Sequence, residues 1–425
     1  MTTAWVLAAN VAIPELGGCT ELMVGRFWTT SEYPQGDPRG WADQSDGLAW
    51  ESVPTRFGAA GEAATAITVT AAAMHMSTSD LNETPLSIIT DGQRVAVTSD
   101  AIIAARITKV WSGDRNEAVV RQLAPGTSAK VAPSGILSES VAEDLLSAKA
   151  QQPHLTDPRT AGETLLALLD TSIRTAVPDP AQPVAVLLSA GIDSSSVATL
   201  AAHAGRRVTC YSAGTPWGNE HEGAAELCRH LGVPHVTVEL SLDDLLETAP
   251  VAIRWLGHAT PEKVDIALIG TALLACGHLP EATVLTGYGS DLVNLGLPGS
   301  GAADDPHGEL PGLVAGLQDA RYSGELSAQF HRAASKTLVH PFWAPDVLRH
   351  CLSITPAAKL HRGREKGHLR AAIEHLVPPS VAWRKKVAIH HGGGLQAGLD
   401  QHFGGRQAKA RYYQEKLAAL VERSA

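Results

Sequence analysis

The chain has 425 residues, of which 44% are hydrophobic and 18% charged, and its formal net charge is −10 at pH 7. This length favours two domains, and this composition is typical of a folded globular protein. The acidic balance, without a run of like charges, argues against a general nucleic-acid binder. No apolar run approaches the roughly 20 residues of a membrane-spanning helix. The five cysteines are scattered without Cys-x-x-Cys spacing, so we expect a cytoplasmic protein without a zinc site or a disulfide framework.

Short β-branched runs separated by turn residues fill the amino-terminal part of the chain. The runs Ala66–Thr70 and Arg94–Thr98 are examples, and the turn signal Thr90–Gly92 lies between them. Short strands bounded by turn residues predict an antiparallel sheet. We therefore expect a β-rich domain over residues 1–150, with a polar, proline-bearing linker over residues 148–159.

After residue 160 a predicted helix over 161–176 leads into apolar strands that alternate with helical patterns. We expect strands at 184–188, 208–212, 236–240 and 283–286, one helix ending near His203, and further helices over 220–231, 242–255 and 264–276. This alternation predicts a parallel sheet covered by helices on both faces. The predicted fold class is therefore α/β, with a second domain over residues 160–425 that is mostly helical after residue 310.

A loop rich in small residues, Leu188–Ser196 (LSAGIDSSS), joins the first of these strands to its helix. Small residues allow backbone N–H groups to approach a pyrophosphate closely, and the helix N-terminus adds partial positive charge. Asp193 can hold Mg²⁺ against the phosphates. The Gly-Lys-Ser ending of a Walker-type loop is absent. The alternative interpretation is an ordinary strand–loop–helix connection with serine caps.

Four ordered segments carry a resemblance to a known family. They are the loop 188–196 and the runs 284–292 (VLTGYGSDL), 340–343 (HPFW) and 383–394 (WRKKVAIHHGGG). The loop resembles the pyrophosphatase-type loop of the asparagine synthetase (class B) group, whose members split ATP between the α and β phosphates; Ala190 stands where that group has its second glycine. The later segments resemble the β-lactam synthetases, and the carbapenam synthetases more than the clavam-pathway enzymes. The resemblance covers roughly residues 161–403.

This resemblance implies roles for individual residues. Tyr288 and Glu325 match the family's catalytic pair, in which the tyrosine takes the proton of the attacking amine and the glutamate orients it. Lys386 matches the lysine that stabilises the developing oxyanion, and Asp193 and Asp291 match Mg²⁺ ligands. The implied nucleotide-binding positions are Leu187, Ser189, Gly191, Asp193, Ser194, Ser195, Ala213, Gly287 and the phosphate-contacting Lys366.

Several of these residues also have plainer interpretations. Tyr288 lies between two glycines, which favours a partly buried phenol that acts as a base, and a turn tyrosine is the alternative. Glu325 can be a solvated helix acid. Lys386 is chosen over Lys385 by the register of the motif alone. The glycines at 392–394 suit a mobile lid.

The resemblance implies ATP and Mg²⁺ as cofactors, a small amino diacid as substrate, and a homo-oligomer. The implied reaction is the adenylation of a carboxylate of (2S,5S)-5-carboxymethylproline, followed by ring closure to a carbapenam carboxylate. One alternative is the clavam-type substrate N2-(2-carboxyethyl)arginine. Others are intermolecular amide or lasso-peptide ligation, a catalytically inactive scaffold and a tRNA-modifying pyrophosphatase. The acidic charge and the lack of paired cysteines argue against the last of these.

The amino-terminal domain resembles a degenerate glutaminase of the N-terminal nucleophile type. Asparagine synthetases use a cysteine directly after Met1, whereas here position two is Thr2 and the first cysteine is Cys19. The glutaminase reaction requires the more reactive thiol. We therefore predict no glutamine hydrolysis and a role as a scaffold or association surface.

Overall fold

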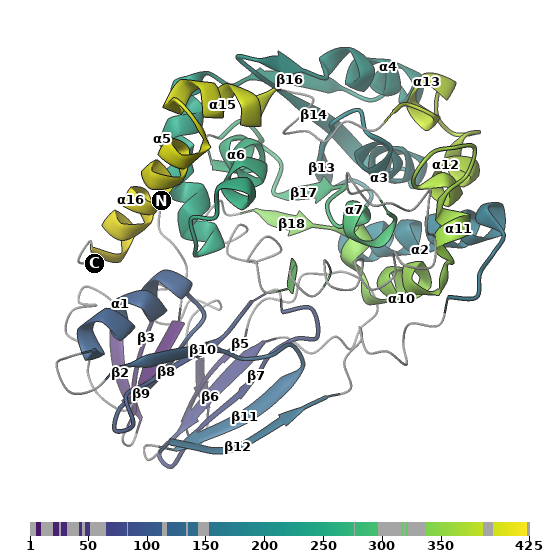
Figure 1. The fold of residues 1–425 in the computed structure, drawn as a ribbon. Helices are drawn as coiled ribbons and strands as arrows, with labels where there is room; N and C mark the ends of the chain where they lie inside the picture. Colours follow the sequence, from purple (N-terminus) through teal and green to yellow (C-terminus); the bar gives the residue numbers. More distant parts are fainter. Residues whose placement is uncertain are drawn as a thin grey trace.

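The structure is a computed structural model of the chain. It describes residues 6–9, 20–24, 27–31, 42–44, 47–51, 65–82, 84–112, 117–132, 135–142, 153–275, 277–295, 317, 320–321, 336–385 and 394–422. A β-rich amino-terminal region lies below a larger α/β region in Figure 1. The predicted fold class is confirmed, while the predicted domain boundaries at residues 150 and 160 stay predictions.

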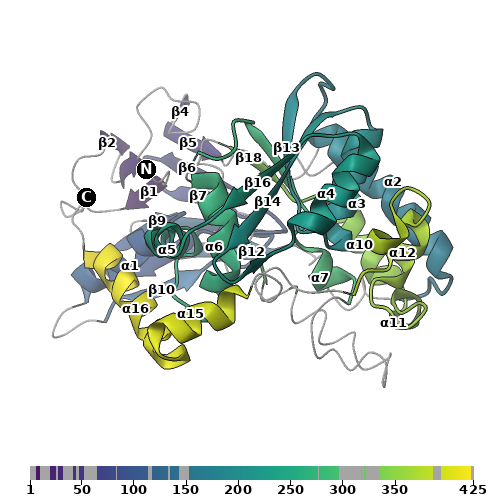
Figure 2. The ribbon, with the colours of Figure 1, turned by 90° about the horizontal axis from the view of Figure 1, so that it is seen from above.

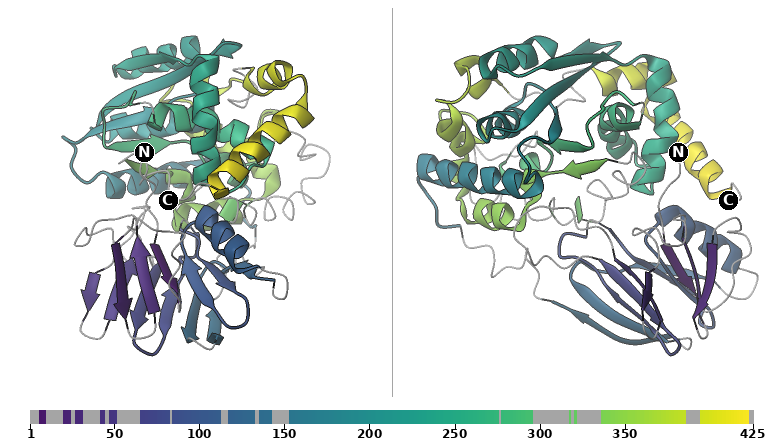
Figure 3. Two further views of the ribbon diagram at one scale, coloured as in Figure 1. Left: turned by 90° about the vertical axis from the view of Figure 1, so that its left-hand side faces the viewer. Right: turned by 180° about the vertical axis from the view of Figure 1, so that it is seen from behind.

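Two antiparallel sheets form the amino-terminal region, as the side and back views in Figure 3 show. The first sheet has the strand order β10-β8-β9-β1-β3-β2 and the second the order β12-β11-β7-β6-β5-β4. Their strands are β1 (Val6–Ala9), β2 (Thr20–Val24), β3 (Phe27–Ser31), β4 (Ala42–Gln44), β5 (Gly47–Glu51), β6 (Ala66–Thr70), β7 (Met74–Ser77), β8 (Ser87–Thr90), β9 (Val95–Thr98), β10 (Val119–Gln122), β11 (Thr127–Ala132) and β12 (Gly135–Val141).

The two antiparallel sheets share one core. Ile67 and Val69 of β6 are fully buried and alternate with half-buried neighbours, as expected for a strand with one face against a core. They belong to the same cluster of buried side chains as Ile88 and Val97 of the other sheet. The sequence pattern at residues 66–70 therefore predicted this strand because its period of two is regular.

Helix α1 (Ala101–Trp111) covers the outer face of the first sheet. Its capping residue Asp100 accepts hydrogen bonds from the backbone N–H groups of Ile102 and Ile103, both at 2.9 Å. A side-chain acceptor at this position satisfies N–H groups that have no partner within the helix. Ile103, Ile107 and Trp111 pack onto the sheet.

A parallel sheet forms the centre of the α/β region. Its order is β15-β14-β13-β17-β18, and β16 also pairs with β14. All pairs are parallel except β14 with the short β15. The strands are β13 (Pro183–Leu187), β14 (Arg207–Thr215), β15 (Gly218–Asn219), β16 (His235–Glu239), β17 (Thr283–Thr286) and β18 (Thr337–Val339).

Helices cover both faces of this sheet, as Figure 2 shows from above. On β13, Val184 and Val186 face one layer of helices and Ala185 faces the other, because successive side chains of a strand point to opposite faces. The first layer contains α2 (Pro158–Ala176), α3 (Ile192–His203), α4 (His221–Leu231), α10 (Pro345–Ser353) and α12 (Gly367–Ile373); the second contains α5 (Leu242–Leu256), α6 (Pro261–Ala275), α15 (Leu395–Phe403) and α16 (Arg406–Glu422).

The part after residue 310 is mostly helical where it is described, and it also contains one strand. Strand β18 (Thr337–Val339) pairs with β17 and adds a parallel strand to the sheet. Sequence analysis missed it because three residues are too few for a periodic pattern. The short helices α7 (Ser290–Val293), α11 (Pro356–Lys359) and α13 (Pro379–Ala382) complete the region.

Helix α1 also joins the amino-terminal region to the α/β region. The Arg254 guanidinium of α5 forms an ion pair with Asp100, with 2.5 Å between the nitrogen and the carboxylate oxygen. Arg106 of α1 donates to the backbone carbonyl of Leu420 in α16 at 2.6 Å. A Cβ atom on Gly257 would lie 2.5 Å from the Ala101 Cβ, so the two regions approach closely there. Among the helices described, none combines the length and the apolar character needed to span a bilayer.

Candidate functional site

The candidate site lies where β13 and β17 end side by side. The two strands are parallel neighbours, and their last residues Leu187 and Thr286 are paired. The loops that follow therefore leave the sheet at the same edge, where open parallel sheets bind their ligands. The first loop leads into α3, whose second residue is Asp193, and the second loop leads into α7, whose second residue is Asp291.

Hydrogen bonds among serines fix the loop before α3. The Ser189 backbone N–H donates to the Ser194 hydroxyl at 3.1 Å, and the two hydroxyl oxygens lie 3.2 Å apart. Gly191 is the capping residue of α3, which contains 12 residues. Ser195 differs from its neighbours, because its side chain is fully buried and its backbone N–H donates to the Gly191 carbonyl at 3.0 Å. The loop thus brings Ser189, Gly191 and Ser194 together, and Ser195 faces the interior.

Ala190 adopts a left-handed backbone conformation, with φ of 52°. This conformation favours glycine, which stands at this position in the family that the loop resembles. The Ala190 residue is fully buried, and a Cβ atom on Gly223 in α4 would lie 2.9 Å from its methyl group. The methyl group therefore points at the first turn of α4 and is enclosed by the core, so it does not narrow the phosphate loop.

Gly287 allows the end of β17 to approach α3. A Cβ atom on Gly287 would lie 2.5 Å from the Ser194 nitrogen and 2.8 Å from the Asp193 carbonyl carbon. Real Cβ contacts are not this short, so only glycine fits between the two backbones. The sequence analysis assigned Gly287 to nucleotide binding. In the structure, the close contact of the two loops also requires a glycine at this position.

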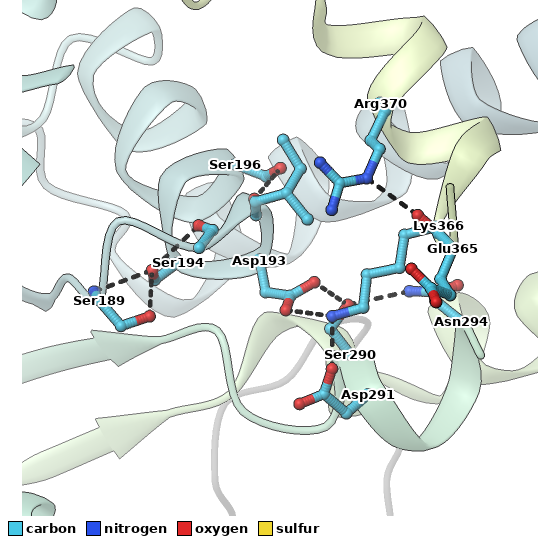
Figure 4. Close-up of polar contacts among 12 residues, drawn as sticks. Ser189, Asp193, Ser194, Ser196, Ser290, Asp291, Asn294, Glu365, Lys366 and Arg370 are labelled. Atoms are coloured by element: carbon cyan, nitrogen blue, oxygen red, sulfur yellow. Dashed lines mark hydrogen bonds and ion pairs between the residues drawn. The ribbon is translucent and has the colours of Figure 1, made fainter. Parts of the chain in front are cut away.

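A buried lysine joins the two aspartates at this edge, as Figure 4 shows. The ammonium group of Lys366 contacts Oδ2 of Asp193 and Oδ1 of Asp291. The lysine side chain has no exposed surface, whereas the Asp193 and Asp291 side chains are 16% and 38% exposed. Burial lowers the pKa of Lys366, but the charges of the two carboxylates outweigh it and the net shift is upward,. The lysine is therefore positively charged.

Further polar groups form hydrogen bonds around the lysine–aspartate cluster, which consists of Lys366, Asp193 and Asp291. The Ser290 hydroxyl donates to Oδ1 of Asp193 at 2.6 Å, and the Asn294 amide donates to the Ser290 hydroxyl at 3.1 Å. His368 Nε2 lies 3.0 Å from the Asn294 side-chain oxygen. Sequence analysis missed Ser290, Asn294 and His368. Only Ser290 had a signal, since it precedes Asp291 in the run 284–292.

Lys366 is itself fixed at the start of α12. It caps this helix in the left-handed conformation, with φ of 58°. A Cβ atom on the next residue, Gly367, would lie 2.3 Å from the His361 Cβ. One turn later Arg370 donates to the carbonyls of Glu365 at 2.9 Å and Ala382 at 2.6 Å. The backbone that carries the lysine is therefore packed on several sides.

Tyr288 lies at the same edge, in the loop between β17 and α7. It packs partly against the core, and its ring centroid is 5.3 Å from that of His340. Its backbone N–H donates to the Thr286 hydroxyl at 3.1 Å, and the same hydroxyl lies 2.6 Å from His340 Nδ1. Burial lowers the pKa of His340 to about 3, so this imidazole is neutral at physiological pH.

Of the other predicted residues, some lie in described strands and others lie outside the described residues. Leu187 is the last residue of β13, whereas Ala213 lies inside β14, which continues to Thr215 through its pairing with β15. Sequence analysis ended this strand too early because Gly214 interrupts the apolar run. Glu325, Lys386, Thr2 and Cys19 lie outside the described residues, as do the glycines at 392–393.

Glu220 and Arg384 form a second charged contact close to the loop. The Arg384 guanidinium lies 3.4 Å from Glu220 Oε1, and a Cβ atom on Gly223 would lie 2.0 Å from the same guanidinium. Burial raises the pKa of Glu220 to about 7, although Arg384 opposes the shift. No sequence motif indicated Glu220, which is the capping residue of α4.

The donor set at the sheet edge fits both groups that sequence analysis implied. A Mg²⁺ ion takes oxygen ligands and is commonly held by one or two carboxylates together with substrate phosphates. Asp193 and Asp291 already converge on one cation, the Lys366 ammonium. The N-terminus of α3 and the serine hydroxyls suit the phosphates. Asp193 and Asp291 would hold the metal, and the loop would hold the nucleotide.

The sequence matches one family model, that of asparagine synthase, over residues 164–339 and 329–424. One similar protein is the carboxyethyl-arginine beta-lactam-synthase of Streptomyces clavuligerus, which is 29% identical over 319 residues. The match covers 74% of this chain and 56% of that relative, so the chain spans about half the length of the relative it matches.

Two solved structures are also similar to parts of the chain. The NMN synthetase of Francisella tularensis is 15% identical, with 63% of this chain and 94% of that chain covered and a TM-score of 0.29. The predicted tRNA methyltransferase subunit of Methanocaldococcus jannaschii is 16% identical, with 48% and 94% covered and a TM-score of 0.25. TM-scores this low support no argument about function.

Proposed function

Because the chain belongs to the asparagine synthase family, we propose that it is an ATP- and Mg²⁺-dependent ligase that closes a β-lactam ring through an acyl-adenylate. The proposal rests mainly on one observation. Asp193, within the segment 188–196, and Asp291 contact the same lysine at the carboxyl edge of the parallel sheet. The similarity to a β-lactam synthase supports the same reaction class.

In the first proposed step, a carboxylate of the substrate attacks the α-phosphorus of ATP and pyrophosphate leaves. The loop hydroxyls and the N-terminus of α3 bind the phosphates and stabilise their negative charge. Asp193 and Asp291 would hold Mg²⁺, which would neutralise further charge on the phosphate oxygens. Ser290, which donates to Asp193, keeps that carboxylate in place.

In the second proposed step, the substrate amine attacks the activated carbonyl and AMP leaves. Tyr288, assisted by Glu325, accepts the amine proton, and Lys386 stabilises the oxyanion. Because a four-membered ring is strained, the site must hold amine and carbonyl close together and exclude water. We expect Tyr288→Phe to lower ring closure while pyrophosphate release continues. Ring closure at the unchanged rate would remove Tyr288 from the role of base.

Two substrates are compatible with this reaction. The motifs at 284–292 and 340–343 favour (2S,5S)-5-carboxymethylproline and a carbapenam product, as sequence analysis predicted. The similarity to a relative named for carboxyethyl-arginine favours N2-(2-carboxyethyl)arginine and a monocyclic product. Both are amino diacids, so the same adenylation chemistry serves either one.

One assay tests the reaction class and the substrate together. Purified protein is incubated with ATP, Mg²⁺ and each amino diacid in turn, and the nucleotide products and product masses are measured. We expect AMP, pyrophosphate and a product that is lighter than its substrate by one water. Release of ADP and orthophosphate, or no cleavage of ATP with either diacid, would contradict the proposal.

Two further proposals concern the rest of the chain. We propose that the amino-terminal sheets act as a scaffold or association surface, without glutamine hydrolysis; ammonia release from glutamine would contradict this. We also propose a homo-oligomer, for which sedimentation of the purified protein is the test.

A further inference from the structure

The lysine–aspartate cluster already contains a cation before any ligand binds. Lys366 is fully buried, and its ammonium group contacts one oxygen of each aspartate. The aspartates carry two negative charges and the lysine one positive charge, so the cluster has a net charge of −1. A divalent cation that approaches the aspartates meets a carboxylate pair whose charge is already half neutralised.

The lysine has little room to withdraw. Its backbone begins α12 in a left-handed conformation, and Gly367 packs directly against His361. His368, the residue after Gly367, is fully buried, and its Nε2 lies 3.0 Å from the Asn294 side-chain oxygen. The aspartates, by contrast, keep part of their surface exposed. A metal ion can therefore contact the exposed surface of the two carboxylates while the lysine stays on their buried side.

We propose that Lys366 is a built-in cation that keeps the Asp193–Asp291 pair from binding a divalent metal until a nucleotide supplies additional negative charge. The inference rests on the proposed function, because it takes these aspartates as the metal ligands. Lys366 then acts as a positioning residue through the two carboxylates. Mg²⁺ gives up its water reluctantly and commonly relies on substrate phosphates for part of its coordination, so a half-neutralised pair binds it poorly alone.

The chain offers a matched control for a test of this lysine. Lys359 is also a buried lysine, with 1% of its surface exposed, and it lies on the neighbouring α11. Its ammonium group donates to the backbone carbonyl of Val293 at 2.7 Å. Lys359→Met therefore removes a buried ammonium close to the site without removing the contacts to Asp193 and Asp291.

The experiment measures Mn²⁺ binding by electron paramagnetic resonance in the absence of nucleotide and substrate. We expect Lys366→Met to bind Mn²⁺ about tenfold to a hundredfold more tightly than the unmodified protein, because the carboxylates regain their full charge. Mn²⁺ should also raise the melting temperature of Lys366→Met more than that of Lys359→Met. Equal Mn²⁺ affinity in Lys366→Met and the unmodified protein would overturn the inference.

A second measurement needs no variant and separates this inference from the proposed function. The unmodified protein should bind Mn²⁺ weakly alone and about tenfold more tightly with ATP, after subtraction of the Mn²⁺ that ATP binds in a sample without protein. Tight Mn²⁺ binding without ATP would overturn the role of Lys366 even if Lys366→Met fails to fold. Failure of ATP to strengthen Mn²⁺ binding would instead contradict the proposed metal site, and with it both proposals.

Discussion

Two regions of the molecule place a buried lysine between two aspartates, and they differ in what surrounds the charges. At the sheet edge Lys366 contacts Asp193 and Asp291, which are both partly exposed. Between α6, α15 and α16, Lys409 lies 2.5 Å from Asp265 and 2.7 Å from Asp400. Asp265 is 1% exposed, and the Tyr413 hydroxyl donates to it at 2.8 Å.

The comparison shows that residue types alone do not distinguish a ligand site from a structural cluster. Asp265 is closed off by a tyrosine hydroxyl and by α16, so its negative charge is compensated entirely within the protein. Asp193 and Asp291 lie at the carboxyl edge of parallel strands, where side chains face an open loop region. Because Asp400 of the second cluster is also 31% exposed, position in the fold decides the role rather than exposure of the carboxylates. The following predictions test this division.

The largest expected effect is on stability, at the closed cluster. Lys409→Met leaves the buried Asp265 without its counter-charge, and breaking a buried ion pair in this way costs about 3–5 kcal/mol. Urea unfolding should show this loss in the free energy of unfolding. ATP–pyrophosphate exchange by the remaining folded protein should stay close to that of the unmodified protein. A stability change below about 1 kcal/mol would show that the cluster is not structural.

The next effect is on activity, at the open cluster. Asp193→Asn should lower substrate-dependent ATP–pyrophosphate exchange on the order of 10²–10³-fold, as the loss of a group that stabilises transition-state charge does. The matched variant Asp265→Asn should change exchange little at a temperature where it is folded. If both variants lower exchange by the same factor, the proposed division between the clusters is wrong.

The two hydroxyl donors give a finer comparison. Tyr413→Phe removes the hydrogen bond to Asp265, and a hydrogen bond to a charged group contributes about 1.5–3 kcal/mol to stability,. Ser290→Ala removes the hydrogen bond to Asp193 and should raise the Mg²⁺ concentration needed for half-maximal exchange. Thermal unfolding and Mg²⁺ titration of both variants measure these effects. A higher Mg²⁺ requirement in Tyr413→Phe, with an unchanged requirement in Ser290→Ala, would contradict the division between the two clusters.

The smallest effect concerns Glu220, a buried carboxylate without a lysine in contact. Burial raises its pKa from 4.5 to about 7. The folded state therefore binds more protons than the unfolded state between these values, and the stability contributed by the protonated group is lost as the pH rises through about 7. The melting temperature of Glu220→Gln, relative to the unmodified protein, should increase from pH 5 to pH 8. The exposed Glu163→Gln serves as control and should show no such trend.

The central strands of the α/β region were predictable from sequence because they are buried on both faces. The expected strand 283–286 coincides with β17, and the expected 184–188 lies one residue from β13. The expected helix over 220–231 ends at the same residue as α4, and the next residue, Gly232, caps it with φ of 68°. Such continuous apolar runs and glycine stops are local signals. The strand β18 has no comparable signal.

The site was only partly predictable, because sequence motifs do not encode contacts between distant segments. The motifs placed Asp193 and Asp291 after two predicted strands, and the structure brings them to one lysine. The contact of Lys366 with Asp291 joins residues separated by 75 positions. Lys409 and Asp265 are separated by 144 positions and lie in no motif. Both lysine clusters result from the packing of helices onto the sheet.

Helix α1 has a consequence for any shortened version of the chain. Its capping residue Asp100 is the partner of Arg254, and its Arg106 binds the carbonyl of Leu420 near the end of α16. A protein that started after residue 150 would leave a guanidinium and a helix terminus facing water. The amino-terminal region thus contributes contacts that stabilise the α/β region, and a fragment of residues 151–425 should unfold at a lower temperature than the whole chain.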